Sequence, residues 1–221
     1  MELNSNMDEN NNKSVHDRLL DSAEQLFCER GFESTSIRDI AALADCNIAS
    51  VNYYFGGKQQ LYEQVWRRHL IPLRDSRIAS IQKVMAQSQN NLRLEDLLRS
   101  FAEAFVGTMN TQKSSRLNKL MAREYIDNHL PVNMFVDEVM TPPVEAMQKA
   151  LLQTYPDLDE PKIPFLIFSL IGQLVHLVHV RAMFENIEDN PLRKMFYSNE
   201  VIEHIVNFSS AGIRAYIKEK E

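Results

Sequence analysis

The stretch NIASVNYYFGGK, residues 47–58, places polar amides, three aromatic rings, two glycines and a lysine close together. A strand would bury every second residue, and a core helix would be less polar. The composition instead indicates a short segment that faces a partner on one side and its own domain on the other. Val51 and Phe55 are four residues apart and predict the inner face of a short helix. Asn47 suits the N-cap of this helix, and Gly56-Gly57 predicts its end.

The residues before this stretch predict two more helices. Apolar side chains follow a 3.6-residue period at Val15, Leu19, Leu20, Ala23, Leu26 and Phe27. Gly31 suits the end of that helix. Ser36 begins the next helix, with Asp39 as its capping-box partner. Its inner face is predicted to comprise Ile37, Ile40, Ala41 and Ala44. Asp45-Cys46 forms the turn, because Asp tolerates the left-handed conformation better than most residues.

The rest of the chain also has helical periodicity. Lys58 is predicted to open a long helix to about residue 85, with a bend near Pro72. Further helices are expected at 93–110, 114–128, 132–155, 161–186 and 199–219. Thr141-Pro142-Pro143 predicts a kink or a split, and Pro191 suits a loop. Pro161 and Pro164 suit a helix start.

These elements predict an all-α fold with two domains. Residues 13–60 form an N-terminal three-helix domain with a helix-turn-helix for DNA binding, and the fourth helix links it to the next domain. Residues 61–221 form a helical domain for ligand binding and dimerisation. The polar residues 1–12 are expected to be a disordered arm.

Two short helices joined by a tight turn form a helix-turn-helix, whose second helix can enter the DNA major groove. Asn52 can pair with an adenine edge, Ser50 can donate or accept, and Ile48 and Ala49 offer apolar surface to thymine methyl groups. A lysine at a helix N-terminus suits a phosphate. The predicted DNA-binding residues are Thr35, Ser36, Arg38, Asn47, Ile48, Ala49, Ser50, Asn52, Tyr53, Tyr54 and Lys58. The alternative is that the two tyrosines pack against the fourth helix and that the lysine is merely solvated.

The bulk composition neither supports nor excludes DNA binding. The 221 residues carry a formal net charge of −6, and residues 13–77 hold nine basic and nine acidic side chains. Any face that binds an anion must therefore be a local arrangement. Cys28 and Cys46 do not form a C-x-x-C pair, so we expect buried free thiols in a reducing cytoplasm. The polar, acidic N-terminus does not resemble a signal peptide.

One run, FLIFSLIGQLVHLVHV at 165–180, is strongly apolar. A membrane span needs roughly twenty residues. The run is shorter and contains Gln173, His176 and His179, so we expect no membrane contact and a helix buried by protein on every side. The two histidines are three residues apart, which permits metal chelation. That face offers no Cys, Asp or Glu, so a buried histidine without metal is favoured and no metal or cofactor is predicted.

The first part of the chain resembles the TetR family of bacterial transcriptional regulators. Members show A-x-x-L-F-x-x-x-G-[FY], T-[ST]-[IV]-x-x-I-A and Y-[YH]-F-x-x-K-x-x-L. These patterns are met here by Ala23, Leu26, Phe27, Gly31, Phe32, Thr35, Ser36, Ile37, Ile40, Ala41, Tyr53, Tyr54, Phe55, Lys58 and Leu61. Two positions depart from the pattern, since Asp45 replaces the usual turn glycine and Ile48 replaces a frequent Lys or Gln. Arg123-Glu124-Tyr125 and EVMTPPVEAMQKAL at 138–151 resemble the CerR/CecR-like subgroup.

The resemblance implies a homodimer on a near-palindromic operator, with a ligand cavity in the C-terminal domain and repression lifted by a small molecule. Apolar faces predict dimerisation through 163–184 and 199–217, where Gly172 and Gly212 would allow close approach. The predicted dimerisation residues are Phe165, Phe168, Leu170, Leu174, Ile202, Ile205 and Ile213. The candidate ligand-binding residues are Phe101, Phe105, Met109, Met121, Tyr125, Phe135 and His176. Either set can instead be plain monomer core, and Arg123-Glu124 is expected to be an internal ion pair.

Two other classes of function remain as alternatives. An enzyme would need a catalytic constellation, and the sequence contains no Gly-rich phosphate loop, HExxH or GxSxG, so we expect no enzymatic activity. A helical protein-interaction adaptor that has lost DNA binding would keep the fold but not the base-reading surface.

Overall fold

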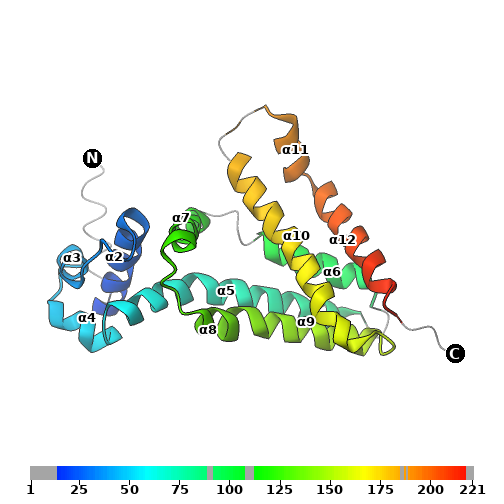
Figure 1. Ribbon diagram of the computed structural model, residues 1–221, viewed down its shortest axis with the longest axis horizontal. Coiled ribbons are helices and arrows are strands. Elements are labelled where there is room, and N and C mark those ends of the chain that lie inside the picture. The colour runs from blue at the N-terminus through cyan, green and yellow to red at the C-terminus, as the bar shows by residue number, and fades with distance from the viewer. Residues whose placement is uncertain (1–13, 89–91, 108–111, 185–186, 188, 218–221) are drawn as a thin grey trace. The chain divides into compact units, whose positions relative to one another are not determined.

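The computed structural model describes residues 14–88, 92–107, 112–184, 187 and 189–217, without the side chains of 112–115, 122 and 125–127. The predicted arm 1–12 lies outside this part. Within the described residues the secondary structure is helical, and a single isolated bridge pairs Leu158 with Ile217. The predicted all-α fold is confirmed (Figure 1).

The chain divides into two compact units, Met1–Ile71 with Gln112–Phe135 and Pro72–Thr111 with Val136–Glu221. The predicted domains 13–60 and 61–221 do not coincide with these units. The helix α5 (Lys58–Gln87) contributes to both, and Pro72 lies inside it.

The first unit contains the three predicted short helices. They are α2 (Val15–Arg30), α3 (Ile37–Leu43) and α4 (Ile48–Phe55), and the unit also holds α7 (Gln112–Asp127) and α8 (Val132–Phe135). Its core is apolar and aromatic. The ring of Tyr62 lies 4.9 Å from that of Phe27 and 4.8 Å from that of Phe32. Val51 and Leu61 are fully buried. Such packing fixes α4 on the other helices.

The second unit is built on α6 (Leu94–Gly107), α9 (Thr141–Thr154), α10 (Ile163–Phe184), α11 (Pro191–Tyr197) and α12 (Asn199–Arg214). A short 3₁₀ turn, η2 (Glu160–Lys162), precedes α10. Two ion pairs join α6 to α12. Arg99 binds both carboxylate oxygens of Glu203 at 2.6 and 2.8 Å, and Glu95 lies 2.6 Å from Arg214. The bidentate geometry makes the first pair the more directional of the two.

The predicted interruption at Thr141-Pro142-Pro143 takes the form of a π-helical segment, η1 (Val136–Met140), directly before α9. Pro142 has no N–H, so the carbonyl of Glu138 loses its usual helical donor. Nη1 of Arg74 in α5 donates to that carbonyl at 3.0 Å. A side chain from another helix therefore replaces the missing main-chain bond.

Two expectations about the second unit were wrong. Pro191 begins α11 instead of lying in a loop, because Asn190 caps the helix and proline suits its first position. The helix α10 is not buried on every side. By length and composition Glu160–Phe184 could cross a membrane, but only 33% of its most apolar window is buried in the monomer. The helix therefore has an apolar face that its own chain leaves uncovered.

Candidate nucleic-acid interface

The turn between α3 and α4 is held by main-chain and side-chain bonds. Asp45 adopts the left-handed conformation, with φ of 51°, as the sequence predicted. The amide of Cys46 donates to the Ala41 carbonyl at 2.9 Å. Arg18 of α2 donates to the Asp45 carbonyl at 3.4 Å. The turn is therefore fixed to α2, by a residue that helical periodicity alone did not mark.

Both ends of α4 are defined by the predicted caps. The Asn47 side chain accepts from the Ala49 amide at 2.9 Å, and Gly56 ends the helix with φ of 79°. Val51 and Phe55 are buried against the other helices. A helix that buries two residues four apart leaves the opposite arc free.

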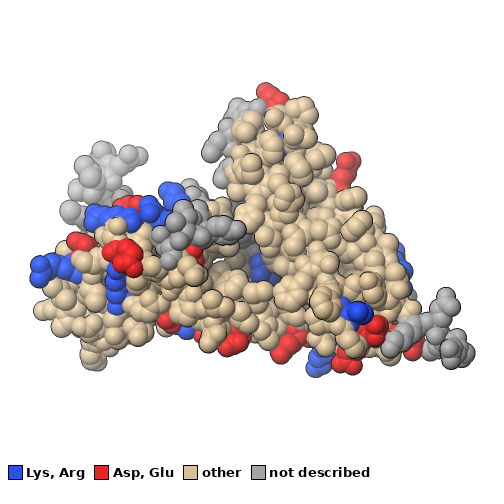
Figure 2. Space-filling model, in the orientation of Figure 1, with Lys and Arg blue, Asp and Glu red and all other residues tan. Residues whose placement is uncertain are grey.

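That outer arc carries the residues predicted to read bases. Tyr53 is 83% exposed, and Ile48 and Tyr54 are each 44% exposed. Ala49 and Asn52 are exposed, and Ser50 is half-buried. The two tyrosine rings meet edge to face at 5.0 Å, and Tyr54 also meets the ring of His16 in α2 at 6.1 Å. The sequence of α4 contains no charged side chain, and Figure 2 shows an uncharged surface over it.

Polar groups flank this arc on both sides. Ser36 and Asp39 form the predicted capping box, and Arg38 in the first turn of α3 is exposed. Lys58 begins α5, and its ammonium lies 4.2 Å from the ring centroid of Phe32. Arg38 and Lys58 are thus the cations nearest in sequence to α4, which we call the reading helix.

Thr35 was predicted to contact phosphate, and this assignment was wrong. Its side chain is 1% exposed, and its hydroxyl donates to the carbonyl oxygens of Gly31 at 2.8 Å and Leu26 at 3.3 Å. Thr35 therefore closes the end of α2 instead of facing a partner.

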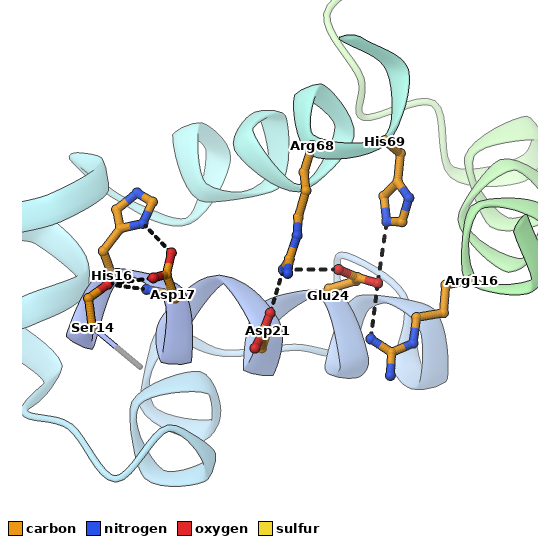
Figure 3. Close-up of polar contacts among 8 residues, drawn as sticks. All are labelled: Ser14, His16, Asp17, Asp21, Glu24, Arg68, His69 and Arg116. Carbon is orange, nitrogen blue, oxygen red and sulfur yellow. Dashed lines mark hydrogen bonds and ion pairs between the residues drawn. The ribbon is translucent and has the colours of Figure 1, made fainter. Parts of the chain in front are cut away.

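A buried carboxylate, Glu24 of α2, lies at the centre of a charge cluster (Figure 3). Arg68 and His69 approach it from α5 at 3.2 and 3.3 Å, and Arg116 approaches from α7 at 3.2 Å. Burial by itself raises the pKa of Glu24. His69, Arg116 and Arg68 outweigh that effect and hold the pKa at about 2. The cluster joins three helices of the first unit through one anion.

Arg123 and Glu124 of α7 were expected to pair with each other, and this was wrong because each has its own partners. Arg123 donates to the Cys28 carbonyl at 3.0 Å and to that of Glu29. Glu124 accepts from the Tyr62 hydroxyl at 2.7 Å and from a main-chain amide at residue 130. Together with Glu24 these contacts bind α7 to α2 and α5. Their partners lie far apart in the sequence, which is why helical periodicity did not find them.

The candidate ligand-binding residues do not form one described cavity. Phe101 and Phe105 are buried in the core of the second unit, whereas Met121 and Phe135 belong to the first unit. Met109 and the side chain of Tyr125 lie outside the described residues. His176 is exposed, as is His179, so the expected buried histidine was wrong. A shallow groove of about 510 Å³ is lined by none of these residues but by Glu145, Gln148, Lys149, Leu152 and Gln153.

The predicted dimerisation residues fall into two groups. Leu170, Leu174, Ile205 and Ile213 are at most 5% exposed and belong to the monomer core, so their assignment to an interface was wrong. Ile202 is half-buried. Phe165 is 69% and Phe168 46% exposed on α10. On α10 the buried Leu170 and Leu174 and the two exposed phenylalanines therefore occupy different faces of the helix.

Two family models match the chain. One, described as bacterial regulatory proteins of the tetR family, matches residues 19–65. The other, described as the C-terminal domain of the HTH-type transcriptional dual regulator CecR, matches residues 94–213, more than half of the chain.

Curated relatives match over the helix-turn-helix region. The probable HTH-type transcriptional regulator YttP of Bacillus subtilis is 46% identical over 52 residues, 24% of this chain and 25% of that protein. The biofilm operon icaADBC HTH-type negative transcriptional regulator IcaR of Staphylococcus aureus is 40% identical over 50 residues, 23% of this chain and 27% of that protein. The match spans about a quarter of the length of these relatives.

Solved structures match over nearly the whole chain. A tetR-family regulator from Shewanella sp. PV-4 has a TM-score of 0.63 at 17% identity, covering 91% of this chain and 98% of that one. A tetR-family regulator from Mesorhizobium loti has a TM-score of 0.61 at 16% identity, covering 91% and 95%. At such identities the likeness shows the fold.

Proposed function

Because the chain belongs to the TetR family and is a DNA-binding transcriptional regulator, we propose that it binds a near-palindromic operator as a homodimer and is released by a small molecule. The observation that carries this proposal is the outer arc of α4. It holds Ile48, Asn52 and Tyr53 exposed on a short helix whose opposite face is locked into the unit.

In the proposed complex α4 enters the major groove. The Asn52 amide is suited to an adenine edge, and Ile48 offers apolar contact to a thymine methyl group. The Tyr53 and Tyr54 hydroxyls and the Arg38 and Lys58 cations are suited to the phosphates on either side. Asn47 and Ser36 already serve as helix caps, so they contribute less to binding than their positions in the sequence suggested.

One reading helix contacts few base pairs, so a second copy is needed. We place the dimer contact on the uncovered face of α10 and α12, which pack side by side (Figure 1). Phe165, Phe168 and Val175 on α10 and Phe208 on α12 are large exposed apolar residues. Open space above Gly172 allows a close approach. A two-fold partner would cover the apolar face that the monomer leaves open.

Release requires an effector that prefers one of two states. A preference of about 1–3 kcal/mol already lowers operator affinity several-fold to a hundredfold. We propose that α5 and α7 carry the change to the first unit, because α7 is bound to α2 through Glu24 and Arg123. IcaR is described as a negative regulator, and we propose the same direction here, with the protein acting in the cytoplasm.

The test is a gel shift with DNA from immediately upstream of the chain's own gene, at two salt concentrations. Binding that excess random DNA cannot displace, and that weakens with salt, is the expected result. If no fragment is retained above the random control, the operator proposal fails. A protein-interaction adaptor with the same fold then becomes the better description.

A further inference from the structure

Arg77, in the part of α5 that belongs to the second unit, has a guanidinium group without a polar partner. Its Nε is buried and donates no hydrogen bond to any of the described residues. Its side chain also forms no ion pair within that part of the chain. The residue as a whole is half-buried.

The guanidinium lies against an aromatic wall. Its central carbon is 3.7 Å from the ring centroid of Phe105, and the ring of Phe101 lies 6.0 Å from that of Phe105. Both phenylalanines are buried in α6. One face of the cation therefore lies against a buried aromatic ring.

This arrangement leaves a charge uncompensated. Burial lowers the pKa of Arg77 to about 10, and no neighbouring carboxylate raises it. The group is still protonated at neutral pH. Two other arginines of the same unit have acidic partners, Glu203 for Arg99 and Glu95 for Arg214. Buried charges are normally paired, and a cation–π contact compensates only in part.

We propose that Arg77 anchors the anionic group of an amphipathic small molecule bound by the second unit. The planar guanidinium suits a carboxylate, phosphate or sulfonate because it can donate two parallel hydrogen bonds. The inference rests on the proposed function, since it assigns a chemical class to the effector. It identifies an organic anion and not a purely hydrophobic compound.

Two fluorescent probes with the same ring system test the charge requirement. 8-Anilinonaphthalene-1-sulfonate carries an anion, and N-phenyl-1-naphthylamine does not. Binding of each probe is titrated with the full chain and with Arg77→Gln, Arg77→Met and Arg93→Gln. Arg93 is the matched control, because its side chain is 70% exposed in the same unit.

The expected result is a loss of at least about tenfold in affinity for the sulfonate in both Arg77 variants. Binding of the neutral probe should change by less than about twofold, and Arg93→Gln should bind both probes as the parent does. Folded Arg77→Gln that binds the sulfonate as tightly as the parent overturns the proposal.

Thermal unfolding separates a ligand anchor from a structural residue. Removing an uncompensated charge should leave the melting temperature of ligand-free Arg77→Met unchanged or raised. The stabilisation that the sulfonate gives the parent should disappear. A melting temperature several degrees lower, or failure of both variants to fold, means that Arg77 supports the fold and overturns the proposal.

The gel shift keeps this inference distinct from the proposed function. Ligand-free Arg77→Gln should bind operator DNA as the parent does. A chain that binds the sulfonate through Arg77 but binds no operator refutes the proposed function and leaves the anion site standing. If the chain binds the operator but the parent and the Arg77 variants bind the sulfonate with equal affinity, only the anion site is refuted.

Discussion

Arg123 in α7 donates from Nε to the main-chain oxygen of Cys28, 3.0 Å away at the C-terminal end of α2. The last carbonyls of a helix lack helical donors, and a cation there is also favoured by the helix dipole. A residue distant in sequence therefore completes the end of the helix on which α3 and α4 pack.

Replacing Arg123 should weaken the first unit. Arg123→Gln removes a charged donor from two carbonyls, so we expect the free energy of unfolding to fall by about 1–3 kcal/mol. Urea denaturation followed by circular dichroism measures it. Arg93→Gln is the control, since its exposed side chain should cost less than about 0.5 kcal/mol. Equal losses in the two variants would contradict a capping role for Arg123.

The Glu24 cluster predicts a specific acid sensitivity. The pKa of Glu24 is about 2 in the folded chain, below its ordinary value of 4.5. The group therefore stabilises the fold above pH 4.5, and that contribution is lost as the pH falls towards 2. Across this window the parent should lose about 3 kcal/mol more stability than Glu24→Gln.

Stability is measured by urea denaturation at several pH values between 2 and 6. Glu24→Gln should already be less stable at neutral pH, because Arg68, His69 and Arg116 lose their shared anion. The exposed Glu145→Gln serves as control and should keep the slope of the parent. Parallel curves for the parent and Glu24→Gln would show that the carboxylate is not held ionised by its neighbours.

The outer arc of α4 should decide operator affinity. The double change Tyr53→Ala with Lys58→Ala removes two phosphate-reaching groups and should abolish the gel shift while the dimer survives. Asn52→Ala alone should cost about 1–3 kcal/mol of discrimination at one base pair. Tyr216→Ala, an exposed tyrosine of the second unit, is the control. Unimpaired binding by the double variant would mean that DNA meets another surface.

The open face of α10 and α12 should govern the oligomeric state. Phe165→Glu and Phe208→Glu each place a charge in a face that we propose to be buried between copies, so the dimer should dissociate at micromolar concentration. Analytical ultracentrifugation measures the mass. Val132→Glu is matched in exposure at 65% but lies in the first unit, so it should stay dimeric. A parent that sediments as a monomer removes the basis for a two-headed operator complex.

Much of the helix-turn-helix could be predicted from the sequence because its signals are local. Ser36 with Asp39, Asn47 and Gly56 each act within a few residues of their own position, and the structure contains all four as predicted. Asp45 adopts the left-handed conformation for the same local reason. Caps and turns of this kind depend on neighbouring backbone and little on the rest of the fold.

The remainder depends on contacts between distant residues. Thr35 fits a phosphate-binding pattern, yet its hydroxyl bonds two carbonyls at the end of α2. Helical periodicity marks Leu174 and Phe165 alike as apolar, but only packing decides which of them the monomer buries. The sequence does not show that Arg77 lacks a polar partner among the described residues, because its neighbours in space come from other helices.

The absence of charge on α4 also bears on how many copies of the protein a cell requires. Non-specific binding to chromosomal DNA depends on Lys and Arg side chains that contact phosphates. In this chain the cations nearest in sequence to α4 are Arg38 and Lys58. Most of the protein that is not bound to its operator should then be free in solution, because it binds other DNA only weakly. Occupancy of the operator will then be set by the concentration of free protein and its specific affinity, with little reserve bound elsewhere on the DNA.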